Sequence, residues 1–458
     1  MSRPARAAAP GARRDRRTRS SGARGADRTG TEFEVEVGPV AHGGHCVARH
    51  EGRVVFVRHA LPGERVLARV TEGSDGSRFW RADAVRVLRA DPDRVEPPCP
   101  VAKPGLCGGC DLQHATLPRQ RALKAQVVAE QLHRLAGLEV QVDVEEVPLP
   151  PGAPAPEHPG LRWRTRTQFA VDAEGRTGLR GHRSHEVVPL ADCPISTPAV
   201  AGSGVLGQRF GNVATVEVAA GSDGGDPLVV VTPSEGARAH LPKLPGASVA
   251  VRTPEGLHRV SGRTRVGERV LVHGEELSFR VSGAGFWQVH AGAGTVLTEA
   301  VLDALAPRAG ERALDLYAGA GLFTAVLARA VGEEGSVLAV EGEARAVRDA
   351  RRSLHDAPQV ELWEGRVEEA LADPELEGAG VDVVVLDPPR SGAGREAVEA
   401  IARLRPRAVA YVACDPAALA RDVASFAQRG YVLDGLRAFD LFPMTHHVEC
   451  VARLVPAR

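Results

Sequence analysis

A cysteine at the end of a buried strand has the chemistry of a nucleophile. Cys414 follows the apolar run 408–413 and precedes a helical pattern over 419–428. A thiolate is a good nucleophile, and a helix N-terminus lowers the pKa of a nearby thiol. A lone cysteine is more often inert core packing. Ligands bind at the carboxyl ends of parallel strands, however, so this position favours covalent catalysis.

A glycine-rich segment earlier in the chain is typical of a nucleotide loop. The segment 315–321 reads Asp-Leu-Tyr-Ala-Gly-Ala-Gly and follows an expected strand. Glu341 ends the next expected strand, where a carboxylate can bind ribose hydroxyls. A dinucleotide fold would carry a third glycine near Thr324, and its absence favours S-adenosyl-L-methionine (SAM) over NAD. A purely structural glycine turn is the alternative.

An Asp-Pro-Pro-Arg turn at 387–390 ends the expected strand 381–386. Its strand end lies on the same sheet edge, so Asp387 is a candidate ligand of a bound nucleotide or base. Adenine-N6 methylases use a similar turn followed by an aromatic residue, but Arg390 follows here. An ordinary proline-rich turn is the other interpretation.

Glu449 lies inside the apolar strand expected over 447–454. Burying a carboxylate costs free energy unless it is paired with a cation or has a functional role. Because burial also raises its pKa, Glu449 is a candidate base. A buried ion pair is the alternative. His446 and His447 are rival bases, but neighbours on a strand face opposite ways, so at most one shares a given face.

Three clustered cysteines indicate a metal site. Cys99, Cys107 and Cys110 lie on a Pro/Gly-rich loop, and Cys193 or His114 could supply a fourth ligand. Zinc and iron–sulfur both accept such ligands, and chance clustering is a third possibility. The count of seven cysteines is odd and no signal peptide precedes them, which favours a reducing cytoplasm over a disulfide framework.

The net charge of −1 hides a basic N-terminus. Residues 1–30 carry nine arginines and two aspartates, a net charge of +7, so the remainder carries −8. Such an arm suits contact with RNA, although a solvated disordered tail is an equal alternative. The stretch 162–166 interleaves arginines with Trp163. This pattern could bind single-stranded RNA by base stacking, and a solvent-exposed strand edge is an equal alternative. No apolar run is long enough to span a membrane.

Element patterns predict three ordered regions after the tail. Short strand-like runs over 32–90 suggest a small β-barrel, and 162–281 is β-rich after an expected helix over 117–136. Strands and helices alternate from 286 onward, which predicts a parallel doubly wound α/β sheet that ends in an antiparallel hairpin.

Together these motifs resemble the RNA 5-methyluridine methyltransferases, which methylate carbon 5 of specific uridines in tRNA or 23S rRNA. The resemblance covers residues 32–454. It is carried by five segments: 286–290 (Phe-Trp-Gln-Val-His), 315–321, 387–390, 412–422 and 442–449. The barrel resembles a TRAM domain, an RNA-binding module, and the cysteines match the iron–sulfur members of the family.

The resemblance assigns a role to each candidate residue. It implies that Cys414 is the nucleophile, Glu449 the proton acceptor, Gln288, Tyr317, Glu341 and Asp387 the SAM ligands, and Cys99, Cys107, Cys110 and Cys193 the ligands of a [4Fe-4S] cluster. Two features depart from the family: the first cysteine gap is longer, and Arg366 stands where Asp or Asn is common. No adenine contact is therefore assigned to Arg366.

We therefore expect a SAM-dependent RNA (uracil-5-)-methyltransferase that forms a covalent cysteine–C6 adduct. Its expected parts are a disordered tail (1–30), a TRAM barrel (31–92), a central β-rich α+β domain with the iron–sulfur site (93–285) and a Rossmann-like methyltransferase domain (286–458). We expect a cytoplasmic monomer with RNA as its partner and no membrane contact. The alternatives are a non-catalytic, metal-stapled RNA-binding protein and another SAM-dependent nucleic-acid methyltransferase. A radical SAM methylthiotransferase would need a Cys-x3-Cys-x2-Cys motif, which is missing here.

Overall fold

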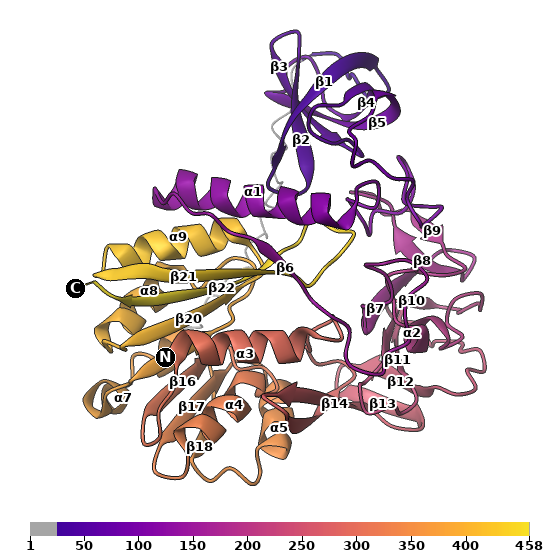
Figure 1. Ribbon diagram of the computed structural model, residues 1–458. Helices are drawn as coiled ribbons and strands as arrows, with labels where there is room; N and C mark the ends of the chain where they lie inside the picture. The colour runs from indigo at the N-terminus through magenta and orange to yellow at the C-terminus, as the bar shows by residue number, and fades with distance from the viewer. Residues whose placement is uncertain (1–24, 458) are drawn as a thin grey trace, which may run out of the picture.

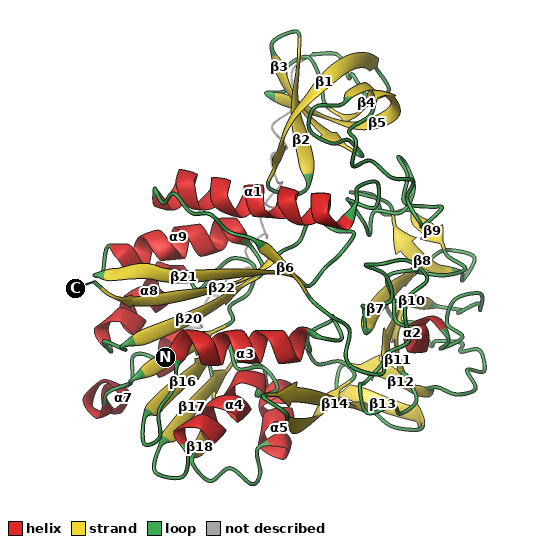
Figure 2. Ribbon diagram, in the orientation of Figure 1, coloured by secondary structure: helices red, strands yellow, loops and turns green. Residues whose placement is uncertain are grey.

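The computed structural model describes residues 25–457, which form four sheets (Figures 1 and 2). In this part of the chain no helix is both long and apolar enough to cross a membrane.

The N-terminal sheet is a closed five-stranded barrel in the order β1-β2-β3-β5-β4. Its strands are β1 (Glu32–Ala41), β2 (His45–His50), β3 (Arg53–Arg58), β4 (Arg65–Glu72) and β5 (Phe79–Arg89). Alternate residues of β1, such as Phe33, Val35 and Val37, point into the barrel core. Closure leaves no free strand edge, which explains how strands this short form a stable unit.

Residues 25–30 belong to the expected basic tail, yet they contact the barrel. Arg28 pairs with Asp75, and the backbone N–H of Gly30 donates to the carbonyl of Val70. Residues 1–24 of the expected tail lie outside the described part of the chain.

The central region is a seven-stranded sheet in the order β13-β12-β11-β10-β7-β8-β9. Its strands are β7 (Arg166–Val171), β8 (Thr177–Arg180), β9 (Val187–Pro189), β10 (Val213–Ala219), β11 (Leu228–Pro233), β12 (Ser248–Thr253) and β13 (Gly256–Ser261), with the short helix α2 (Pro198–Ala201) beside them. A separate hairpin of β14 (Arg265–Val272) and β15 (Glu275–Ser282) packs on α3 and α5 of the following sheet.

The C-terminal sheet has eight strands in the order β18-β17-β16-β19-β20-β22-β21-β6. Its strands are β6 (Val144–Glu146), β16 (Arg312–Leu316), β17 (Ser336–Glu341), β18 (Val360–Glu364), β19 (Val383–Leu386), β20 (Ala408–Ala413), β21 (Tyr431–Asp440) and β22 (Glu449–Pro456). The helices are α3 (Ala293–Leu305), α4 (Leu322–Val331), α5 (Ala344–Ser353), α6 (Val367–Ala370), α7 (Pro374–Ala379), α8 (Gly394–Arg403) and α9 (Pro416–Ala427). Strands β16 to β20 are parallel and the β21–β22 pair is antiparallel, so the doubly wound prediction is confirmed.

Helix α1 (Leu117–Ala136) has local signals at both ends. Thr116 caps its first turn, and Gly137 ends it in the left-handed conformation with φ 68°. Figure 1 shows α1 lying beside α9, and the strand after it, β6 (Val144–Glu146), joins the C-terminal sheet next to β21. The segment 117–146 therefore packs on the C-terminal sheet, although it precedes the central sheet in sequence.

Candidate active site

Five elements bring the expected reactive residues to one edge of the C-terminal sheet. Parallel strands β16, β17, β19 and β20 end beside Tyr317, Glu341, Asp387 and Cys414. Strand β22 runs the opposite way, so it begins at that edge, with Glu449 as its first residue. The fold therefore gathers the candidate nucleophile, base and donor loop at the position where open α/β sheets bind ligands.

Two of the expected SAM ligands, Gln288 and Asp387, contact each other, and a third, Glu341, contacts the glycine loop. Glu341 accepts a hydrogen bond from the backbone N–H of Gly319 at 2.8 Å, so its carboxylate lies against the glycine loop. The side-chain amide of Gln288 donates to Asp387 at 3.5 Å. Tyr317 has a φ of 63°, an uncommon conformation for a non-glycine residue, where the chain turns from β16 into the loop. Tyr317 and Glu341 thus lie at the turn between β16 and α4, and Asp387 follows the neighbouring strand β19.

Asp315, which opens the glycine motif, is a further functional candidate that our site prediction omitted. It is fully buried, and the hydroxyl of Thr324 donates to its Oδ2 at 2.5 Å, whereas its Oδ1 has no hydrogen-bond partner. Burial raises the pKa of Asp315 to about 7, and the charges of Asp387 and Glu341 act in the same direction. Its place at the start of the motif was the sequence signal that could have identified it.

The expected lowering of the Cys414 pKa is wrong. Burial, followed by the charges of Glu449 and Asp387, raises the pKa of Cys414 to about 11, and the Arg390 guanidinium acts against this rise. Helix α9 begins with Pro416, which has no N–H, so one free donor is missing from the helix N-terminus beside Cys414. Asp415 caps that helix itself by accepting from the N–H of Ala418 at 2.8 Å.

Glu449 has the environment of a base. It is buried, and burial together with the charge of Asp387 raises its pKa well above the ordinary value, while Arg390 lowers it. The two carboxylates interact strongly enough to be treated as one titrating pair. Arg390 is therefore a cation that favours ionisation of both Glu449 and Cys414.

The expectation that His446 and His447 face opposite ways is wrong. Both precede β22 in a loop, and their ring centroids lie only 4.1 Å apart. Nδ1 of His446 lies 2.6 Å from a carboxylate oxygen of Asp111, and Nε2 of His447 lies 3.5 Å from the Arg390 guanidinium. Neither occupies the position of Glu449 at the start of β22.

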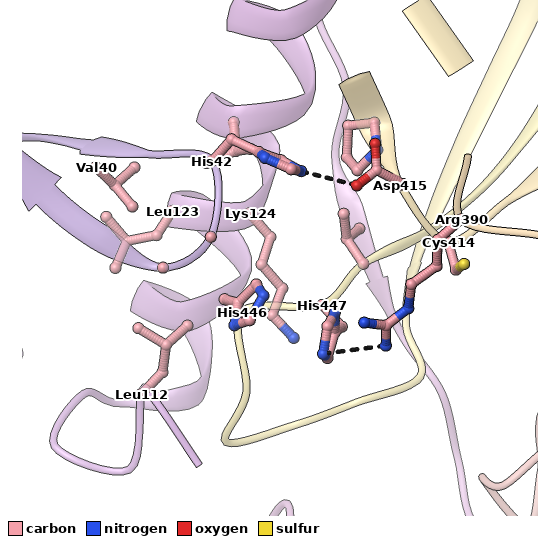
Figure 3. A pocket seen from close by; sticks show the side chains of 15 residues that line it. Val40, His42, Leu112, Leu123, Lys124, Arg390, Cys414, Asp415, His446 and His447 are labelled. Carbon is pink, nitrogen blue, oxygen red and sulfur yellow. Dashed lines mark hydrogen bonds and ion pairs between the residues drawn. The ribbon is translucent and has the colours of Figure 1, made fainter. Parts of the chain in front are cut away.

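A cavity of about 180 Å³ is lined in part by Cys414 (Figure 3). Its walls come from the barrel, α1 and the C-terminal sheet. They comprise Val40, His42, Gly43, Gly44, Leu112, Leu123, Lys124, Val127, Arg390, Cys414, Asp415, Pro416, His446, His447 and Val448. The cavity combines apolar walls with cationic side chains next to the candidate nucleophile.

The four expected cluster ligands come together, although they are far apart in sequence. Burial raises the pKa of Cys99, Cys107 and Cys110, and the charge of Cys193 raises each of them further. His114 instead lies beside His59 beneath the barrel. Among the described residues, no three His, Cys, Asp or Glu side chains are arranged around a single metal ion.

Comparison with known proteins defines the class. Residues 256–455 match the family described as tRNA (Uracil-5-)-methyltransferase, and residues 27–85 match the TRAM domain. A Streptomyces avermitilis protein named as an uncharacterized RNA methyltransferase is 52% identical, with 93% of this chain and 99% of that protein covered. The 23S rRNA (uracil(1939)-C(5))-methyltransferase RlmD of Alkalilimnicola ehrlichii is 35% identical, with 92% and 96% covered.

The fold has a counterpart among solved structures. The Pyrococcus abyssi tRNA (uracil-54, C5)-methyltransferase, crystallised with S-adenosyl-L-homocysteine, matches with a TM-score of 0.67 and 22% identity, over 92% of this chain and all of that one. This likeness shows that the two chains share a fold. The family model and the sequence relatives show that the chain belongs to the RNA (uracil-5-)-methyltransferase family, as the sequence resemblance predicted.

Proposed function

We propose that this protein transfers the methyl group of SAM to carbon 5 of a uridine in RNA through a covalent adduct on Cys414. The observation that carries the proposal is the placement of Cys414 and Glu449 side by side at the edge that holds the donor loop. We favour 23S rRNA as the substrate, because a relative named for that activity is 35% identical along almost its whole length. The neighbour named for tRNA is 22% identical.

Carbon 5 of uracil is a poor nucleophile until carbon 6 is attacked. The Cys414 thiolate forms a bond to carbon 6, and the electron pair of the C5=C6 bond moves toward the carbonyl at carbon 4. Carbon 5 then bonds to the methyl carbon as the sulfonium–methyl bond breaks. Glu449 takes the proton from carbon 5, and the S–C6 bond breaks to restore the double bond and the thiolate. Dividing one difficult step into two easier ones is the purpose of covalent catalysis.

The charges of the site support SAM as the donor. The charges of Asp387 and Glu341 both raise the pKa of Asp315, so the two carboxylates lie near that buried group. A sulfonium cation is attracted to such a site, whereas its product, S-adenosyl-L-homocysteine, carries no sulfonium charge. Carboxylates that lie beside the sulfonium therefore favour substrate over product, whereas Glu341, which lies against the glycine loop, is expected to bind the part that both compounds share.

The uridine must leave its stack to reach Cys414, at a cost of a few kcal/mol. The cavity beside Cys414 provides apolar walls for the base and one cationic neighbour, Arg390, for its polar edge or for phosphate. The barrel, which matches the RNA-binding TRAM module, contributes to the same cavity.

We further propose that Cys99, Cys107, Cys110 and Cys193 hold a [4Fe-4S] cluster. Each thiolate binds a different iron in such a cluster, so its ligands need not surround one point as those of a zinc ion do. Arg164 supports this proposal, because its buried charge interacts with Cys193 and Cys110 and would offset the negative charge of four thiolates. The cluster would hold the loop 99–110 against the central sheet. It takes no part in methyl transfer.

The proposed function is tested on unmodified RNA, namely transcripts of 23S rRNA segments and tRNA from cells that lack this gene. Purified protein and methyl-labelled SAM are incubated with each RNA, and the digested nucleosides are separated. The proposal predicts labelled 5-methyluridine in one RNA class, and no label with Cys414→Ala. Label on another nucleoside, or full activity of Cys414→Ala, would refute it.

A further inference from the structure

The turn that joins β1 to β2 reaches from the barrel into the cavity beside Cys414. We name residues 41–45 the hairpin tip. Val40, His42, Gly43 and Gly44 line the same cavity as the candidate nucleophile (Figure 3). These residues lie at least 370 positions from Cys414 in the chain, so nothing local in the sequence links them.

His42 contacts the residue that follows the nucleophile. Its Nε2 lies 3.0 Å from Oδ2 of Asp415, as the dashed line in Figure 3 marks. The other oxygen of Asp415 accepts from the N–H of Ala418 in α9. Asp415 is therefore held on one side by its own helix and on the other side by the barrel.

Gly44 packs against the loop that precedes the candidate base. It has a φ of 77°, and a Cβ added there would lie 2.5 Å from the Cβ of His446. Only glycine fits this approach, because a side chain would clash and would also be strained. The hairpin tip thus touches both chain segments that carry catalytic groups, 414–416 and 446–449.

We infer that the hairpin tip forms a wall of the uridine pocket and that His42 is a positioning residue for the Cys414 turn. The inference rests on the proposed function, because it assigns the cavity to the flipped uridine. Without His42, Asp415 keeps only its contact with α9, and the turn that aims the Cys414 sulfur loses its anchor on the barrel. Small errors in the placement of a reacting atom have large effects on rate.

The test measures the rate of the covalent complex formed with 5-fluorouridine RNA in the presence of SAM, together with the affinities for RNA and for SAM. In His42→Ala we expect complex formation to be roughly tenfold slower, with both affinities unchanged. His42→Gln, which keeps a donor, restores most of the rate. The matched control is His258→Ala, on the exposed strand β13, which reacts at the wild-type rate.

Two results would overturn the inference. One is a wild-type rate in His42→Ala, and the other is a loss of rate that follows weakened RNA binding and is not rescued by glutamine. If the wild-type protein forms no covalent complex at all, the proposed function itself fails, so the two failures are distinguishable. Thermal unfolding of each variant shows whether a lost rate is a loss of folding.

Discussion

The Nζ of Lys124 on α1 lies 2.5 Å from Oδ1 of Asp440 at the end of β21, and both side chains are almost fully buried. The same ammonium group donates to the carbonyl of Phe442 at 3.0 Å. The pair joins the helix that follows the cysteine loop to the chain segment that leads into Glu449. Removing one partner of such a buried ion pair strongly lowers the stability of the protein, because the other partner is left as an unpaired buried charge.

We predict that Lys124→Met lowers the free energy of unfolding by about 3–5 kcal/mol, measured by urea denaturation. The matched control is Lys103→Met, because Lys103 is exposed and lies 3.7 Å from Glu96, and we expect it to change that free energy by less than about 1 kcal/mol. Adding Asp440→Asn to Lys124→Met should recover part of the loss. Equal effects of the two lysine substitutions would contradict the burial argument.

The raised pKa of Cys414 predicts how adduct formation depends on pH. The thiol loses its proton only as the pH approaches about 11, so a small fraction is thiolate at neutral pH. We expect the rate of the 5-fluorouridine complex to rise about tenfold per pH unit from pH 7 to pH 9, followed by stopped-flow quench and gel analysis. A rate that is flat over this range would mean that the thiol ionises below pH 7 in the bound state.

Arg390 lowers the pKa of both Cys414 and Glu449, so its removal should raise both pKa values. In Arg390→Gln both groups need a higher pH to ionise. We expect a several-fold slower complex at pH 8 and a rate profile displaced to higher pH. The control is Arg395→Gln, an exposed residue on α8 whose partner is Glu399, which should leave the profile unmoved. A drop in rate with an unmoved profile would mean that Arg390 acts only in substrate binding.

Several features were predictable because their causes are local. The caps Thr116 and Gly137 bound α1, and alternating strands and helices place Cys414, Asp387 and Glu341 at one sheet edge. The charges that set the Cys414 pKa were not predictable, because they come from β19 and β22 across the sheet. The contact of His42 with Asp415 was hidden for the same reason, since it spans 373 positions and depends on how the barrel docks.

Glu341 should bind the part of the donor that SAM and S-adenosyl-L-homocysteine share. Glu341→Gln keeps an acceptor for Gly319 but removes the charge that favours ribose hydroxyls. We expect roughly tenfold weaker binding of both compounds by calorimetry, so their ratio is unchanged. Glu361→Gln, exposed on β18, serves as the control. A selective loss of SAM binding would instead place Glu341 beside the sulfonium.

The cysteine proposal predicts about four iron and four sulfide per chain after anaerobic purification, with visible absorbance. Cys107→Ser should lose both, whereas Cys46→Ala should keep them, because Cys46 lies in the barrel core and its thiol donates to the carbonyl of Ala60. Zinc without sulfide in the wild-type protein, or iron retained by Cys107→Ser, would contradict the assignment.

The central claim is that Cys414 forms a bond to carbon 6 of a uridine in RNA. The most direct measurement is peptide mass spectrometry of the complex trapped with 5-fluorouridine RNA and SAM, after digestion by nuclease and protease. The account predicts one methylated 5-fluorouridine nucleotide attached to the peptide that contains Cys414, and no complex from Cys414→Ala. A nucleotide attached to another residue, or a complex of normal yield from Cys414→Ala, would contradict it.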